Sequence, residues 1–203
     1  MRIDAKMVAR LRAETGAPMM DCKEALQEAQ GDFEKAKELL RKKGKQVAER
    51  AASREVKEGK FFSYVHPPGK IAVLVEVVCE TDFVAKNEEF NAFGKGVCFT
   101  ITHYAPKFLN RDQVDPVVVA KEREIVLEQT LQTMNGKPQQ VIDKAVEGRM
   151  EKFFAEKCLL DAQFVDPTGQ GDAMSVEQRR HQLVGKIGEN IQIRRFVRME
   201  FGG

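Results

Sequence analysis

A change of hydrophobic period between residues 60 and 79 constrains the fold of this chain more than any other feature. The new period begins with Phe61, Tyr64 and Val65, continues through a turn at residues 66–69 and ends in a β-branched run over residues 71–78. This pattern predicts a β-hairpin. A further strand is expected from Ile191 to Phe201, and the sheet of the core needs strands distant in sequence.

The first 44 residues carry the signals of three short amphipathic helices. The first follows a candidate N-cap at Asp4, and the second runs from about Met20 to Gly31-Asp32. The third begins near Phe33, with Gly44 as its expected C-cap. After it, the charged, alanine-rich stretch over residues 46–59 predicts a solvated helical linker.

Helical periodicity returns after the hairpin. One helix is expected after Thr81-Asp82, two more begin at Pro116 and Pro138, and a last one is capped by Ser175. A loop is expected over residues 166–171. The sequence therefore predicts the α+β class, with an antiparallel sheet packed on helices. The predicted domains are a three-helix domain over residues 1–45, the linker over 46–59 and an α+β core over 60–203.

Composition limits the classes of partner. Of 203 residues, 42% are apolar and 32% are charged, so the chain can build a core without metals or disulfides. The 33 basic and 31 acidic residues nearly cancel, which argues against a direct role on nucleic acid or anionic membranes. We see no signal peptide or membrane anchor, and four widely spaced cysteines favour a reducing cytoplasm.

Residues for catalysis are missing from the sequence pattern. His66, His103 and His181 have neither a carboxylate nor a thiol at a spacing typical of a nucleophilic pair. The phosphate-binding, dinucleotide-binding and zinc-protease motifs are absent, and Gly94-Lys95-Gly96 lies within a helical pattern. We therefore expect a protein that is not an enzyme and has no cofactor or metal of its own.

The segment from Thr81 to Val84 runs off a buried strand into a helix start. Taken by physical chemistry alone, this segment is ordinary. Asp82 caps the helix by accepting from free backbone N–H groups, and Phe83 packs against the following turn.

The same segment, within Glu76–Lys86, resembles the central signature of the elongation factor Ts family, whose members are exchange factors for elongation factor Tu. Two departures are visible, Pro18 where the family usually has Gly and Val78 where it usually has Asn. Other blocks resemble the family in the same order: Leu11–Ala17, Met19–Leu26, Gly136-Lys137-Pro138, Glu147-Gly148-Arg149, Ile187–Ile191 and Arg194-Arg195. The first two resemble its N-terminal signature, in a ubiquitin-associated-like three-helix domain.

The resemblance implies a mechanism. The turn Thr81-Asp82-Phe83-Val84 would enter between two helices of the GTPase, near its Mg²⁺ and phosphate-binding elements. Phe83 would be the wedge, and Asp82 would perturb the polar network beside the metal. Further contacts with elongation factor Tu are implied for Leu11, Arg12, Met19, Met20, Lys23, Ile187, Gly188, Glu189 and Asn190.

Length adds an expectation about assembly. The chain resembles the short form of the family, which lacks half of a duplicated core, so a homodimer and a complex of two factors with two GTPases are implied.

Two alternative functions stay open. One is an interaction module that recruits a partner through the three helices while the core dimerises, and the other is an unrecognised hydrolase or transferase.

Overall fold

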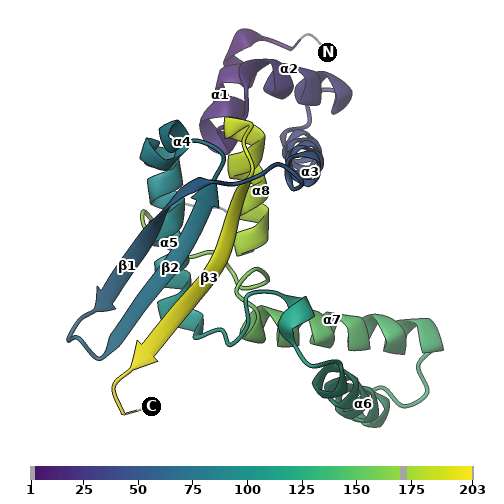
Figure 1. Ribbon diagram of the computed structural model, residues 1–203. Coiled ribbons are helices and arrows are strands. Elements are labelled where there is room, and N and C mark those ends of the chain that lie inside the picture. Colours follow the sequence, from purple (N-terminus) through teal and green to yellow (C-terminus); the bar gives the residue numbers. More distant parts are fainter. Residues whose placement is uncertain (1–2, 170–172, 203) are drawn as a thin grey trace. The chain divides into compact units, whose positions relative to one another are not determined.

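The computed structural model describes residues 3–169 and 173–202 and has α+β architecture (Figure 1). In chain order the elements are α1 (Ala5–Thr15), α2 (Met19–Glu28), α3 (Phe33–Ala51), β1 (Glu58–His66), β2 (Ile71–Cys79), α4 (Asp82–Lys86), α5 (Glu88–Tyr104), the 3₁₀ helix η1 (Arg111–Gln113), α6 (Pro116–Thr133), α7 (Gln139–Lys157), α8 (Val176–Ile187) and β3 (Ile191–Glu200). The strands form one antiparallel sheet in the order β1-β2-β3. The predicted hairpin, completed by the distant strand near residue 191, is confirmed.

The chain divides into two compact units, each assembled from segments distant in sequence. The first comprises Met1–Phe62, Val75–Lys95 and Glu177–Arg195. The second comprises Ser63–Leu74, Gly96–Val176 and Phe196–Gly203. Among the residues that the structure describes, none of the helices combines the length and apolar character needed to cross a bilayer.

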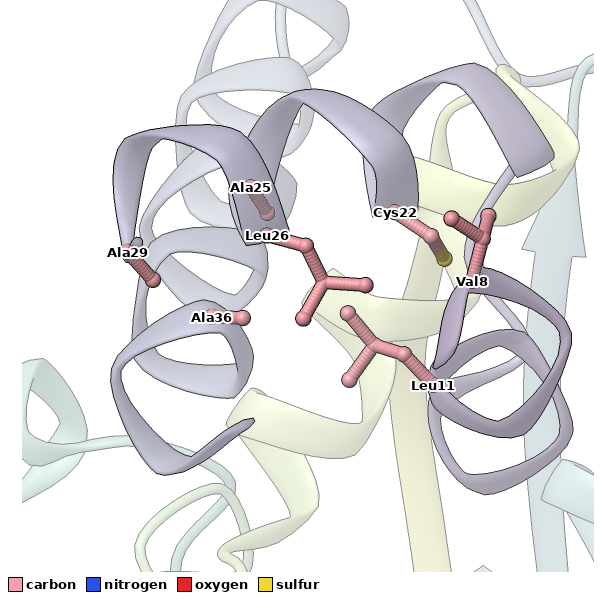
Figure 2. Close-up of a cluster of buried hydrophobic side chains, with 7 residues drawn as sticks. All are labelled: Val8, Leu11, Cys22, Ala25, Leu26, Ala29 and Ala36. Atoms are coloured by element: carbon pink, nitrogen blue, oxygen red, sulfur yellow. The ribbon is translucent and has the colours of Figure 1, made fainter. Parts of the chain in front are cut away.

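The helices α1, α2 and α3 share one apolar core. Its buried members are Val8, Leu11, Cys22, Ala25, Leu26, Ala29 and Ala36 (Figure 2). The predicted N-cap Asp4 is confirmed, because its Oδ1 accepts from Met7 N at 2.8 Å, and Asp32 caps α3 by accepting from Glu34 N at 3.0 Å. Gly16 ends α1 with a φ of 69°, a left-handed conformation that suits glycine.

The third helix departs from expectation at Gly44. It does not end there but continues to Ala51, so the predicted helical linker is helical only over its first part. Gly44 is buried because α3 runs close to α8. A Cβ added at Gly44 would lie 3.2 Å from the carbonyl oxygen of His181, and one added at Gly185 would lie 3.0 Å from the Gly44 Cα. The glycine therefore serves the close approach of two helices and not a helix end.

The helix predicted after Thr81-Asp82 is broken in two at Asn87. This residue has an extended backbone, with φ −64° and ψ 138°, between α4 and α5. Its side-chain oxygen accepts from Glu89 N at 2.7 Å, so it satisfies a free N–H group at the start of α5.

Two glycines inside α5 allow aromatic rings to pack on the helix backbone. A Cβ added at Gly94 would collide with the ring of Phe62, and one added at Gly96 would collide with the ring of Phe164. The prediction that both glycines lie inside a helix is confirmed.

In the second unit, α6 and α7 pair around the buried side chains of Val126, Ile142, Val146 and Met150. The predicted start at Pro116 is confirmed, with Asp115 capping Val117 N at 2.8 Å. Pro138 directly precedes α7, as predicted, and α8 begins directly after Ser175. Of the loop expected over residues 166–171, Gln170 and Gly171 lie outside the described residues.

The contrast between Gly96 and Gly148 tests the packing of α5. Both lie inside helices, but a Cβ added at Gly148 meets nothing within 4 Å. We expect Gly148→Ala to raise the free energy of unfolding by up to about 1 kcal/mol, the gain in helix propensity. Gly96→Ala should lower it by about 1–3 kcal/mol, because the methyl group and the Phe164 ring cannot occupy the same space. Urea unfolding measures both; equal effects would contradict the packing argument.

Candidate functional site

The segment from Thr81 to Val84 begins where the central strand β2 ends. The last strand residues, Val77, Val78 and Cys79, are buried, so the chain leaves the core directly before the site. Thr81 has the extended backbone of an N-cap, and its Oγ1 accepts from Val84 N at 3.4 Å. The expectation that Asp82 caps this helix was wrong, because Asp82 is already its first residue.

Asp82 and Phe83 both lie in the first turn of α4. The Asp82 carboxylate is 2.6 Å from the Lys86 ammonium nitrogen, and this hydrogen bond lowers the pKa of Asp82. Phe83 is 80% exposed, so the expected packing of its ring against the following turn was also wrong. Val84 and Ala85 are buried instead and hold the inner side of the helix. The site thus presents an aromatic ring and a carboxylate to solvent.

A carboxylate from the turn between α8 and β3 holds the start of α4. Glu189 Oε2 accepts from Thr81 N at 3.1 Å, and Glu189 Oε1 accepts from Thr81 Oγ1 at 2.7 Å. A second bond joins the same segments, since Asn190 N donates to Glu80 Oε1 at 2.5 Å.

Asn190 ties this turn to a third segment. Its side chain has 0% exposure, and its Nδ2 donates to Arg54 O at 2.8 Å and to Ala52 O at 3.3 Å. The Arg54 guanidinium in turn donates to Gly188 O at 2.9 Å. Gly188 closes α8 in a left-handed conformation with a φ of 86°. Because Asn190 is fully buried, its side chain is not available to a partner in this structure.

The residues expected on the N-terminal helices divide into two groups. Leu11 has 0% exposure and belongs to the core of the three helices, so the expectation that it contacts a partner is corrected. Arg12 and Lys23 are exposed, as are Met19 (44%) and Met20 (62%) at the start of α2. Pro18 precedes this helix with a φ of −54°, which its ring favours, so this departure from the family pattern causes no strain.

Sequence analysis missed an ion cluster in α8. Glu177 accepts from Arg180 Nε at 2.7 Å and lies 2.9 Å from His181 Nε2. Arg180 also donates to Ile191 O at 2.8 Å and so joins α8 to β3. The spacings of three and four residues could have revealed this cluster. In the stretches 3–169 and 173–202, no group of three or more His, Cys, Asp or Glu is placed to hold a metal ion.

Fold and site together define an α+β protein that presents an aromatic turn on a helix start braced by a distant carboxylate. A family model described as "Elongation factor TS" matches residues 6–171. Proteins named elongation factor Ts are similar over nearly the whole chain. The one from Fervidobacterium nodosum is 48% identical over 202 residues, covering 100% of both chains, and the one from Thermoanaerobacter pseudethanolicus is 49% identical over 201 residues, covering 98% of this chain and 95% of the relative. The protein from Geobacter metallireducens is 47% identical over 202 residues, covering 100% of this chain and 91% of the relative. The chain therefore belongs to the elongation factor Ts family.

The α8 cluster makes stability depend on pH. Burial alone would raise the pKa of Glu177, but the hydrogen bonds from Arg180 and His181 outweigh it and lower the pKa from 4.5 to about 2. A depressed carboxyl pKa stabilises the fold above the unfolded value, and this contribution is lost as pH falls from 4.5 toward 2. We expect Glu177→Gln to remove on the order of 2–3 kcal/mol of this pH-dependent stability, measured by urea unfolding at a series of pH values.

The exposed carboxylate Glu128 gives the matched control, and Glu128→Gln should keep the wild-type pH dependence. If the wild-type protein and Glu177→Gln lost stability in parallel on acidification, the cluster would not stabilise the fold.

Proposed function

We propose that this chain is the guanine-nucleotide exchange factor for elongation factor Tu, and that it promotes GDP release by inserting the turn Thr81–Val84. The exposed ring of Phe83, fixed on a braced helix start, is the observation that carries the proposal. A large apolar side chain at 80% exposure gains by transfer out of water. Complete burial of such a ring is worth roughly 1.5–3 kcal/mol.

The rigidity of the turn determines how much of the free energy of burying Phe83 is available to displace helices of the partner. Val84 and Ala85 anchor the inner side of α4 while the carboxylate of Glu189 holds its N-cap, Thr81. A preorganised wedge loses little conformational entropy on docking, so more of its binding free energy can displace helices of the partner.

Asp82 completes the proposed mechanism. Its carboxylate stays ionised because Lys86 lowers its pKa, and it enters the polar surroundings of the partner's Mg²⁺. That ion is held by phosphates, water and few protein oxygens, so displacing its surroundings weakens nucleotide binding. Linkage makes the effect reciprocal, since GDP weakens binding of the factor by the same ratio. The factor is released unchanged and transforms no substrate itself.

A second contact is proposed for the N-terminal helices, which we interpret as a ubiquitin-associated-like domain within residues 1–45. Arg12, Met19, Met20 and Lys23 offer an exposed surface, and the flexible thioethers of the two methionines suit an adaptable interface. Ile187 at the end of α8 and Gly188 directly after it remain proposed contacts with the partner.

The division into a linker over residues 46–59 and a core domain over residues 60–203 remains a prediction.

A homodimer is proposed from the exposed face of the sheet. The exposed apolar side chains on this sheet include Val65 in β1, Leu74 in β2, and Val197 and Met199 in β3. Exposed apolar patches of this kind mark interaction surfaces. We therefore propose a complex of two factors with two GTPases, located in the cytoplasm where elongation takes place.

The wedge is tested with the double variant Asp82→Ala/Phe83→Ala. We expect it to lose stimulated release of a fluorescent GDP analogue from elongation factor Tu, by about 10-fold or more, because both the apolar anchor and the carboxylate are gone. Val117→Ala, which truncates another exposed side chain (73%) in α6, is the control and should behave as wild type. Unchanged release by the double variant would leave only recruitment through the three helices.

The dimer is tested by Leu74→Glu combined with Val197→Glu. Placing charges in a buried apolar interface should convert the dimer to a monomer, since an unpaired charge is costly to desolvate. Sedimentation equilibrium measures the mass. Leu131→Glu, at an exposed position in α6 (46%), controls for charge alone. A dimer that survives both sheet substitutions would rule out this face.

A further inference from the structure

We infer that Glu189 is a positioning residue for nucleotide exchange. Its carboxylate fixes the direction in which the Phe83 side chain points into solvent. The inference rests on the proposed function and changes the part assigned to this residue, from a contact with the partner to a brace within the factor. It is carried by the two hydrogen bonds from Thr81 to Glu189, at 3.1 and 2.7 Å.

Glu189 takes both donors that Thr81 possesses, its backbone N–H and its hydroxyl. A threonine hydroxyl has one hydrogen, so donating it to the carboxylate leaves the oxygen lone pairs for Val84 N, at 3.4 Å. The carboxylate therefore fixes the orientation in which Thr81 acts as the N-cap. Because the acceptor is ionised, these bonds are stronger than those between neutral groups.

Glu189 is itself held in place by its neighbours on both sides. Gly188 accepts from the Arg54 guanidinium at 2.9 Å through its carbonyl oxygen. Asn190 donates its backbone N–H to Glu80 and its side-chain amide to the carbonyl oxygen of Arg54 at 2.8 Å. The residues on both sides of Glu189 are therefore hydrogen-bonded to Arg54 and Glu80. The Glu189 carboxylate consequently has a defined position before any partner binds.

The cap matters for Phe83 because α4 is so short. A helix of 5 residues has little stability of its own, and loss of a cap costs about 1 kcal/mol. Phe83 is the second residue of this helix, so fraying of the first turn moves it directly. Without Glu189 the ring would still be exposed, but its direction would no longer be fixed.

This role can be separated from direct contact with the partner by examining the free factor. The chain contains no tryptophan and two tyrosines, so Phe83→Trp introduces a single indole at the wedge, which can be excited at wavelengths where tyrosine does not absorb. In that background, we expect Glu189→Ala to lower the fluorescence anisotropy of the indole in the absence of any GTPase, because local motion of the turn increases. Glu88→Ala removes an exposed carboxylate at the start of α5 and should leave the anisotropy unchanged.

The second measurement uses the native wedge and stimulated GDP release. We expect Glu189→Ala to reduce release at saturating factor by about 10-fold, the scale of a charge-assisted hydrogen bond. Glu189→Gln keeps the shape and two possible contacts with Thr81, so it should retain more activity. Thr81→Val removes the hydroxyl, and combining it with Glu189→Ala should cost less than the sum of the two single changes. Melting temperatures identify any variant that has lost its fold, in which case Glu189→Gln decides.

Two results would overturn the inference. Anisotropy that stays at the wild-type value in Glu189→Ala would show that the carboxylate does not hold the turn. A loss of release with unchanged anisotropy would assign Glu189 to the partner interface instead. If Asp82→Ala/Phe83→Ala kept full exchange, the proposed function would fail, while the anisotropy of the free factor would still decide whether Glu189 fixes the turn.

Discussion

The hydrogen bonds between Glu189 and Thr81 join positions 108 residues apart, and the geometry of the exposed turn depends on them. Burial of Val84 and Ala85 fixes only the inner side of α4. The carboxylate supplies the remaining constraint at the first turn, where the helix has free N–H groups. Apolar packing and polar capping act on different ends of the same short element, so neither alone would define where Phe83 points.

Much of this arrangement is organised by α8. Its first turn carries the Glu177 cluster, which reaches Ile191 at the start of β3 through Arg180. Its middle passes close to α3 at Gly44 and Gly185 and donates from Gln182 to Thr15 O at 2.8 Å. Its end leads into the Glu189 turn. The N-terminal helices and the wedge therefore belong to one compact unit.

Sequence patterns predicted the elements whose signals are local. The hairpin followed from the proline-containing turn and the β-branched run, and the starts of α6 and α7 followed from Pro116 and Pro138. The strand β3 was also predicted, within one residue of its observed end. Positions whose role depends on tertiary contact were misread. Glycine at position 44 is typical of a helix end, but here the close approach of α8 requires a residue without a side chain.

The candidate site shows the same division between local and distant information. The exposed turn could be located from its resemblance to the family, but the N-cap was assigned one residue late. Leu11 was expected at the surface because a family signature does not separate core residues from contact residues. The links from Arg54 and Glu80 to the Glu189 turn could not be predicted, since they join segments more than 100 residues apart.

The order of the strands also has a consequence for how the protein is made. The central strand β2 pairs with β3, and β3 begins more than 100 residues after β2 ends. On the ribosome, β2 therefore emerges long before the strand that covers its second edge. Until then, the nascent chain carries an unpaired edge beside the apolar side chains of Val73, Val75 and Val77, which is a template for aggregation. The sheet is thus complete only after the more than 100 residues between β2 and β3 have been synthesised.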